Sequence, residues 1–449
     1  MSHDHIPSRP HVQGFSTPLR LRPSAQELTD GAGLLVLRRL WDRLRIGRWL
    51  DERASGLGGH FRASLMVELW IAVLWYGGGW LEDLRPLSRR GIRRLFGWAR
   101  VPDPTTFGRW LRRAGGPLLP VLDRLIRRLV RIRWSWTGVP KAVTLVLDST
   151  VSVRYGRKQA GAERGYNPKK PGRPSHHPLL AFLQETGDLA GILWRPGSAW
   201  AGARTEDWVP ELVGWLREAG VQEITVRLDK GFWAKRIVRT LQKLEISFLL
   251  KVPNQQFVRD QLGTWRKSTR AEGIFPEAEM VWTNSGRLWG ARLLSLEGRR
   301  PLDADAEGTL PLDTWEVTET AHVLTNLPGI HALTAWRRYN AGCVVEQRIE
   351  ELGQLSVGQT AVDDLGGNRL LWALGGLAYQ LLHLLRTRLS GSWRVAQPKR
   401  LRAWLFRLAG RFTTSGGRWR LDVPPAALEV GLLGRALRAI RGPPPRYSH

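Results

Sequence analysis

Two aspartates each end a short apolar run, and their type and position suggest chemistry. Residues 143–148 read Val-Thr-Leu-Val-Leu-Asp, and residues 224–229 read Ile-Thr-Val-Arg-Leu-Asp. β-branched and apolar side chains in both runs predict short strands. A carboxylate is costly to bury unless something binds it, and ligands collect at the carboxyl ends of strands in open α/β sheets. Asp148 and Asp229 are therefore candidates for one metal site; the plain alternative is that each aspartate caps the turn that follows it.

The elements around these aspartates predict a mixed sheet. Apolar runs at residues 179–183 and 189–194, joined by a Glu-Thr-Gly-Asp turn, indicate a strand hairpin. Next along the chain come a helix from Thr205, the Asp229 strand, a helix over 232–244 and a strand over 246–252. This order of strands and helices predicts an α/β fold, in which helices flank a mixed sheet and the two aspartates lie near one another.

A third acid lies on a predicted helix further along the chain. Within residues 336–353, steps of 3, 4 and 7 residues place four positions on one face of a single helix: Tyr339, Gly342, Glu346 and Gly353. Glu346 is the candidate acid of that face. Glu350, one turn further on, is a rival ligand, with an ordinary surface role as its alternative.

The composition predicts a polyanionic partner. The net charge is +28, from 68 Lys and Arg against 40 Asp and Glu, and cations gain affinity for phosphates by releasing counterions. A GC-rich genome would explain arginine in place of lysine, but not the excess of cations over acids. Cys343 is the single cysteine, which excludes a disulfide within the chain and cysteine-rich zinc fingers, and which favours a reducing compartment such as the cytoplasm.

Neither a signal peptide nor a membrane span is expected. The first residues, Met-Ser-His-Asp-His-Ile-Pro-Ser-Arg, lack the apolar core of a signal peptide. The apolar stretches 69–81 and 370–385 are short or interrupted by glycine and polar residues. We expect both to form buried helices.

A basic helix is predicted after Asp103, where an N-cap is followed by a first-turn proline. Its apolar face carries Phe107, Trp110, Leu111 and Ala114, and its other side carries Arg109, Arg112 and Arg113. A small helical domain with such a helix could dock on DNA in helix-turn-helix fashion. The alternative is a merely solvated basic face.

A basic loop follows the Asp148 strand. Residues 165–174 read Gly-Tyr-Asn-Pro-Lys-Lys-Pro-Gly-Arg-Pro, and this composition excludes a helix. Its Gly-Arg-Pro end is typical of an extended segment that lies in an A·T-rich minor groove, although a solvated surface loop fits equally well. His176 and His177 could contact phosphate or a metal, or could be ordinary loop histidines.

Between residues 252 and 335 the pattern predicts a β-rich module. Residues 280–294 alternate around Asn284-Ser-Gly286, which indicates a hairpin turn there. The module's tryptophans would form a small core or stack on an unpaired base: Trp282, Trp289 and Trp315. Beyond residue 386 arginines are frequent, some helical character remains near Leu401 and Leu408, and regular structure is then expected to fade. A nonspecific DNA clamp or a subunit contact would fit this tail.

These features together resemble the DDE transposases of bacterial insertion sequences. The resemblance covers residues from about 34 to about 385. It rests on Leu-Asp-Ser-Thr, Arg-Gly-Tyr-Asn with Pro-Lys-Lys-Pro-Gly-Arg-Pro, His-Pro-Leu-Leu-Ala-Phe, Asp-Lys-Gly-Phe, the Asp103 helix segment, and the spacing of Tyr339 and Glu346. The matching subgroup carries a Y-(2)-R-(3)-E-(6)-K signature. It implies an RNase H-like fold with a β-rich insertion between the second aspartate and the glutamate.

The resemblance also implies the roles of the acids. Cleavage and transfer of a phosphodiester are best served by two Mg²⁺ ions about 3.5–4 Å apart, with Mn²⁺ as a substitute, and such hard cations prefer carboxylate oxygens. Asp148 would bridge the ions, Asp229 would bind one and Glu346 the other. Further residues would contact DNA: Tyr339, Arg109, Arg112, Arg113, Lys169, Lys170, Arg173, Lys230, Arg338 and Arg348.

Two positions depart from the signature. Gly342 and Gly353 stand where the subgroup has Arg and Lys, and each glycine also costs a helix about 1 kcal/mol relative to alanine. Either neighbours such as Arg338 and Arg348 substitute, or the copy is weakened or inactive. Three functions therefore remain open: a transposase that acts on DNA as a homodimer, a DNA-binding relic, and a metal-dependent nuclease that does not join strands.

The expected domain organisation follows from these patterns. It consists of a disordered lead 1–25, a helical DNA-binding domain 26–136, a catalytic domain in two parts, 137–252 and 336–390, a β-rich insertion 253–335 and a basic C-terminal tail 391–449.

Overall fold

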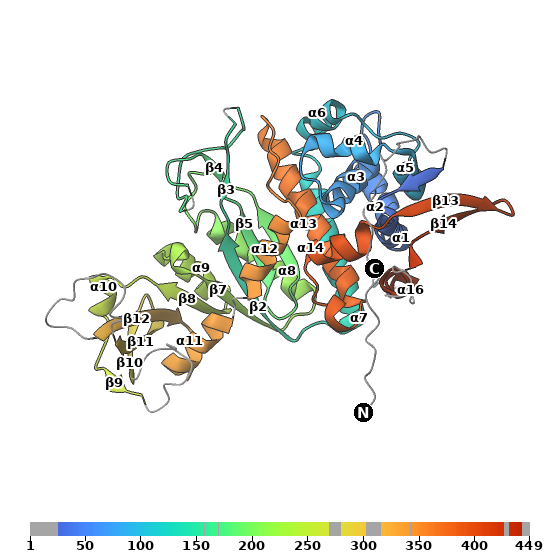
Figure 1. The fold of residues 1–449 in the computed structure, drawn as a ribbon. Coiled ribbons are helices and arrows are strands. Elements are labelled where there is room, and N and C mark those ends of the chain that lie inside the picture. The colour runs from blue at the N-terminus through green and yellow to red at the C-terminus, as the bar shows by residue number, and fades with distance from the viewer. Residues whose placement is uncertain are drawn as a thin grey trace, which may run out of the picture.

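The computed structural model describes residues 26–156, 158–168, 170–268, 280–301, 316–341, 344–425 and 431–441. It consists of an N-terminal group of helices, a large mixed sheet with helices on both faces, and a β-rich edge (Figure 1). The predicted α/β class is confirmed. The lead 1–25 lies outside the described residues, and the proposed domain boundaries stay a prediction.

The N-terminal helices follow one another closely. They are α1 Leu35–Arg43, α2 Ile46–Arg53, α3 Ala63–Tyr76, α4 Leu84–Leu87, α5 Arg90–Phe96, α6 Pro104–Ala114 and α7 Leu119–Thr137. The start of α6 is the predicted one, because the Asp103 side chain accepts a hydrogen bond of 2.8 Å from the Thr105 amide. Phe107 and Trp110 of α6 are buried, as its apolar stripe predicts.

Nine strands form the main sheet in the order β6-β5-β2-β7-β8-β12-β11-β10-β9. Their bounds are β2 Ala142–Ser149, β5 Leu179–Leu183, β6 Leu189–Leu193, β7 Glu223–Leu228, β8 Ser247–Val252, β9 Arg266–Lys267, β10 Met280–Leu288, β11 Ala291–Pro301 and β12 Glu316–Thr325. β2 is antiparallel to β5 and parallel to β7, and β7 is parallel to β8. The β-rich region does not stand apart, since β12 pairs with β8 and extends the same sheet.

Helices cover both faces of this sheet. On one face, α8 Thr205–Glu218 and α9 Lys235–Lys243 pack with Leu145 and Leu147 of β2. On the other face, Val146 belongs to the core that contains α13 Leu365–Thr387. Alternate residues of β2 therefore face opposite layers, as the two-residue period of a strand requires.

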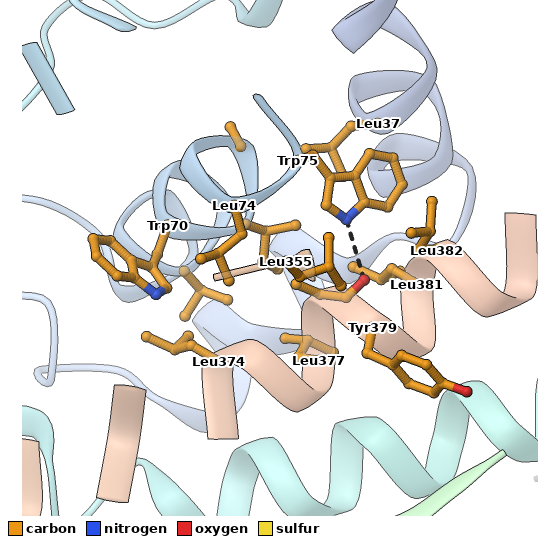
Figure 2. Packing of buried hydrophobic residues seen from close by; sticks show 14 of the residues in the cluster. Leu37, Trp70, Leu74, Trp75, Leu355, Leu374, Leu377, Tyr379, Leu381 and Leu382 are labelled. Atoms are coloured by element: carbon orange, nitrogen blue, oxygen red, sulfur yellow. Dashed lines mark hydrogen bonds between the residues drawn. The ribbon is translucent and has the colours of Figure 1, made fainter. Parts of the chain in front are cut away.

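α13 joins the helical part to the sheet. It is buried along almost its whole length and contacts α3, α6 and α7. Figure 2 shows its leucines facing the tryptophans of α3: Leu374, Leu377, Leu381, Trp70 and Trp75. The Trp75 Nε1 donates a hydrogen bond of 3.1 Å to the Ala378 carbonyl, so the close packing also satisfies a buried donor.

The apolar stretches are buried helices, as expected. Gln380 and His383, the polar residues of α13, lie inside the protein with hydrogen-bond partners from residues 186–189. Among the described helices, no single one is long and apolar enough to cross a membrane. Only α3 together with residues 81–87 passes that test of length and composition, as a pair bent by 96°.

The predicted turn at Asn284-Ser-Gly286 is wrong. β10 runs through these residues, and the chain reverses at Trp289-Gly290, where both residues have positive φ (52° and 80°), as a type I′ hairpin turn requires. Gly286 has a different purpose, because a Cβ there would collide with the backbone oxygen of Gln261. A glycine in a strand often marks such a close backbone approach.

The C-terminal segment is more regular than predicted. After α13 come α14 Pro398–Leu401, a hairpin of β13 Gly410–Ser415 and β14 Arg418–Asp422, and α16 Leu432–Arg441. β13 pairs with the N-terminal strand β1 Glu27–Thr29, and α16 packs on α1. Regular structure persists because this segment buries its apolar side chains against the N-terminal helices.

Candidate active site

The register of the parallel strands brings the two aspartates together. The β2–β7 ladder pairs Val146 with Arg227, so two residues further on Asp148 is level with Asp229. Residues that are level on parallel neighbours point to the same face of the sheet. That face is the one opposite α8 and α9.

The same rule adds a cation that the sequence reading missed. The β7–β8 ladder pairs Arg227 with Leu249, which places Lys251 level with Asp229. Arg227 and Lys251 are half-buried beside the acids. Their alternating positions in two predicted strands were the available signal, but only the strand register shows that they share a face with Asp148.

α11, which spans Ala332–Asn340, covers this part of the sheet. The Arg227 guanidinium lies 4.5 Å from the ring centre of Tyr339, and the Lys251 Nζ lies 5.2 Å from that of Trp336. Burial raises the pKa of Tyr339 to about 12, an effect that Arg227 opposes and that the charges of Asp229 and Asp148 reinforce. The Tyr339 hydroxyl therefore stays protonated and can donate a hydrogen bond.

The negative charges of both other acids act on Asp148. Burial raises the pKa of Asp148 to about 6, and the negative charges of Asp229 and Glu346 raise it further, against the Ser149 amide and Arg227. Burial also raises the pKa of Asp229. Glu346 lies in the first turn of α12, which spans Val344–Gln354, and its side chain is exposed.

The capping alternative also holds for Asp229. Its Oδ1 accepts a hydrogen bond of 2.8 Å from the Gly231 amide and caps a short 3₁₀ turn, Lys230–Phe232. One carboxylate oxygen is thus engaged by the backbone. Asp148 is still within β2, and the amide of the adjacent Ser149 lowers the pKa of its carboxyl group.

The three acids have the oxygen donors that a hard divalent cation binds, but their side chains are not arranged as a complete coordination site. Carboxylate oxygens are the ligands that Mg²⁺ prefers, and mutual repulsion among them is the electrostatic condition that a cation relieves. Within the described ranges, however, no three Asp, Glu, His or Cys side chains converge closely enough to hold an ion. The ligand assignment therefore stays a prediction.

The prediction of one helix through Tyr339 and Glu346 is wrong. Tyr339 belongs to α11 and Glu346 to α12, while Gly342 lies outside the described residues. The two helices have different packing partners: α11 packs through Trp336 and Tyr339 on the β-rich edge, whereas α12 packs through Leu352 on the core around α13. The two helices are separate because the apolar side chains of each pack on a different core.

The other residues of α12 are also placed. Glu350, the rival ligand, is exposed and accepts a hydrogen bond of 3.1 Å from Gln354. The buried acid of the helix is Glu351, which pairs with Arg386 at 2.7 Å and with Arg348 at 2.7 Å. Arg348 is therefore committed to an internal ion pair.

The predicted DNA-contacting cations differ in availability. Arg109, Lys170, Arg173, Lys230 and Arg338 are exposed, and Lys169 lies outside the described residues. In α6, by contrast, Arg112 donates a hydrogen bond of 2.8 Å to Asp363, and Arg113 donates one of 2.9 Å to the Gly58 carbonyl.

The basic loop after β3 Ser152–Val153 is not extended at its predicted minor-groove segment. Gly172 has φ +76°, and the Arg173 amide donates to the Lys170 carbonyl, so the chain turns there. The buried Asn167 side chain bonds both the Lys170 amide and the Arg173 carbonyl. Local hydrogen bonds therefore decide the conformation in place of the Gly-Arg-Pro composition.

His176 and His177 are buried structural residues and not loop ligands. His176 is fully buried, its Nε2 lies 3.1 Å from the Ala160 carbonyl, and its ring meets that of Trp194 edge-on. His177 is hydrogen-bonded to the Ala199 carbonyl at 2.7 Å. Burial lowers the pKa of His176 to about 4, an effect that the charge of Arg154 reinforces.

We expect His176 to make the protein acid-labile. The unfolded chain protonates this histidine near pH 6.5, whereas the folded protein resists protonation down to about pH 4. Stability is therefore unaffected above pH 7 and is lost as the pH falls through this window, by up to about 3 kcal/mol. The difference in free energy of unfolding between the wild type and His176→Gln should be smaller at pH 4.5 than at pH 7.5. An unchanged gap between the two proteins would contradict this assignment.

Acids from three elements on one side of a sheet, set among arginine, lysine and a protonated tyrosine, define a candidate site for phosphodiester chemistry. Residues 12–444 match the family described as transposase DDE domain group 1, and the chain belongs to this family. It is thus a DNA transposase by family, and such enzymes are nucleases and strand transferases that use divalent metal ions.

Further comparisons add little to the family match. No curated protein matches the chain. Among solved structures, the chain is similar to the piggyBac transposase in a cryo-EM structure of its synaptic complex with hairpin DNA. The two share 14% sequence identity with a TM-score of 0.42, over 85% of this chain and 82% of that chain.

Proposed function

We propose that this protein cuts DNA at transposon ends and joins the freed 3′-hydroxyl strand to target DNA. The observation that carries the proposal is the strand register that sets Asp148 of β2 level with Asp229 at the end of β7. The charge of Glu346, from α12, also raises the pKa of Asp148. The strand order β6-β5-β2-β7-β8, with β2 at its centre, supports an RNase H-like catalytic domain.

The three acids would hold two divalent ions, Mg²⁺ or Mn²⁺. When bound, such ions neutralise charge on the attacking and leaving oxygens of a phosphodiester. Asp148, whose pKa both other acids raise, is the proposed shared ligand. Asp229 and Glu346 would each complete one site.

The neighbouring side chains would position the DNA strand. Tyr339, protonated at neutral pH, can donate a hydrogen bond to a phosphate oxygen. Arg227 and Lys251 balance the negative charge of the acids and of the phosphate. The exposed Lys230, next to Asp229, would contact the backbone of the strand near the cut.

An in vitro assay with end-containing DNA and Mg²⁺ tests the proposal against its two alternatives. A transposase cleaves the end and joins it to target DNA, as a homodimer on paired ends. A nuclease cleaves without joining, and a relic binds the ends alone. Binding without cleavage in both Mg²⁺ and Mn²⁺ would overturn the proposed function.

Gly353 offers a separate test of a weakened copy. A Cβ at this exposed position of α12 meets no atom within 4 Å, so an added side chain would begin in open space. Gly353→Lys should raise the free energy of unfolding by up to about 1 kcal/mol, because lysine favours the helix. It should also strengthen DNA binding, whereas Gly353→Ala should raise stability alone. Equal DNA affinities of the two variants would show that the missing cation is unimportant.

A further inference from the structure

A basic groove lies away from the acids, between α2, α7 and α8. It encloses about 870 Å³, and its lining contains seven arginines and two glutamates. α8 packs on the sheet face with Leu145 and Leu147, whereas Asp148 points to the opposite face. The groove is therefore a surface that the cleavage site does not use.

Stacked guanidinium groups characterise the groove. The Arg53 guanidinium lies 4.6 Å from the Trp49 ring centre, that of Arg128 lies 6.0 Å from the same ring, and that of Arg127 lies 5.6 Å from Trp215. These arginines also have hydrogen-bond partners, since Arg53 and Arg127 donate to Glu52 and Glu211 and Arg128 donates to the Leu44 carbonyl. Stacking on an aromatic face fixes the plane of a guanidinium and the direction of its N–H edge. Such an edge suits the planar, two-oxygen geometry of phosphate.

Two further arginines are uncommitted. Within the described parts of the chain, no salt bridge engages Arg45 or Arg124, whereas Arg48 and Arg127 pair with Glu52 and Glu211. Arg45 precedes α2 with φ 52° and ψ 36°, a left-handed conformation that glycine or asparagine adopts more easily. An arginine at a strained position points to use of its side chain.

We infer that this groove binds the phosphate backbone of a second stretch of duplex DNA, distinct from the strand at the acids. The inference rests on the proposed function. The groove has seven arginines against Glu52 and Glu218 in its lining and Glu211 beside it. This excess of positive charge favours a polyanion over a protein surface. The duplex could be a more distant part of the transposon end or the target, because both present the same backbone.

The test compares two variants of equal charge change. Arg45→Glu/Arg124→Glu alters the groove, and Arg39→Glu/Arg239→Glu alters two exposed arginines on α1 and α9. We expect the groove variant to bind duplex DNA about tenfold more weakly, and the slope of log K against log salt to fall by about 2. The control variant should change binding by less than about twofold.

End binding, end cleavage and strand transfer, measured on one preparation, distinguish the two sources of DNA. Loss of end binding and end cleavage assigns the groove to end DNA, and loss of strand transfer with normal cleavage assigns it to target DNA. A groove variant that binds and transfers DNA like the control variant overturns the inference. So does a groove variant whose defect is a changed oligomeric state without DNA, since the groove would then be a protein contact. Failure of the wild type to cleave would instead count against the proposed function, and the binding measurements would still report on the groove.

A second variant separates binding from folding. Arg45→Gly removes the backbone strain together with the guanidinium. We expect a higher melting temperature and DNA binding weakened about three- to fivefold. A fall in both quantities would indicate a structural role for Arg45 and would contradict the inference.

Discussion

Asp148→Asn should abolish DNA cleavage while making the metal-free protein more stable. The loss of activity should reach about 10³-fold, because shared ligands support several kcal/mol of transition-state stabilisation in two-metal phosphodiester chemistry. The gain in stability follows from the raised pKa of about 6. The carboxyl group titrates near pH 4 in the unfolded chain and near pH 6 in the folded protein. The folded state therefore favours the protonated carboxyl group over the charged one. Wild-type stability is therefore lost as the pH rises through this range, by up to about 3 kcal/mol.

The measurement is thermal unfolding in EDTA between pH 4 and 8, together with cleavage of end DNA in Mg²⁺. The variant should melt higher than the wild type at pH 8, and the gap should close near pH 4. Mg²⁺ should then raise the melting temperature of the wild type more than that of the variant. Full strand transfer by the variant would contradict the assignment of Asp148 as a metal ligand.

Asp123 supplies the matched control. It lies on α7, away from the three acids of the site. Burial raises the pKa of Asp123 to about 6, a shift that Arg127 opposes and Glu211 reinforces. Asp123→Asn should therefore reproduce the gain in stability at pH 8. Cleavage should be retained, because residue 123 has no part in the proposed chemistry. Equal loss of cleavage in both variants would show that activity follows global stability instead of metal binding.

Asp188→Ala should destabilise the protein by about 3–5 kcal/mol. Asp188 is completely buried directly before β6, where the Arg133 Nε donates to it at 2.7 Å, the Gln380 Nε2 at 2.8 Å and the Trp134 Nε1 at 3.0 Å. Removing the carboxylate leaves the Arg133 charge buried without a partner, which costs far more than loss of a surface pair. Urea unfolding should report the change as a lower midpoint.

Two comparisons sharpen this second prediction. Glu52→Ala, which removes the exposed partner of Arg48, should leave the urea midpoint almost unchanged. Asp188→Leu combined with Arg133→Met should recover much of the loss, because apolar residues of similar size can replace a buried ion pair. A double variant as unstable as Asp188→Ala would mean that Trp134 and Gln380, and not the arginine charge, depend on Asp188.

Much of the fold could be predicted because its elements carry local signals. The alternating runs at 143–148 and 224–229 and the capped helix at Asp103 depend on residues close in the sequence. The sequence also determined the excess of positive charge and the three acids as candidates. What it could not determine depends on contacts between distant residues.

The tertiary structure determined which residues lie beside the acids. Lys251 lies beside Asp229 because of the register between two strands, and Tyr339 and Glu346 belong to separate helices because each helix packs on a different core. Asp188 looked like part of a turn, yet partners from α7 and α13 make it a buried charge centre. In each case the energy comes from desolvation and long-range packing, which spacing along the chain does not encode.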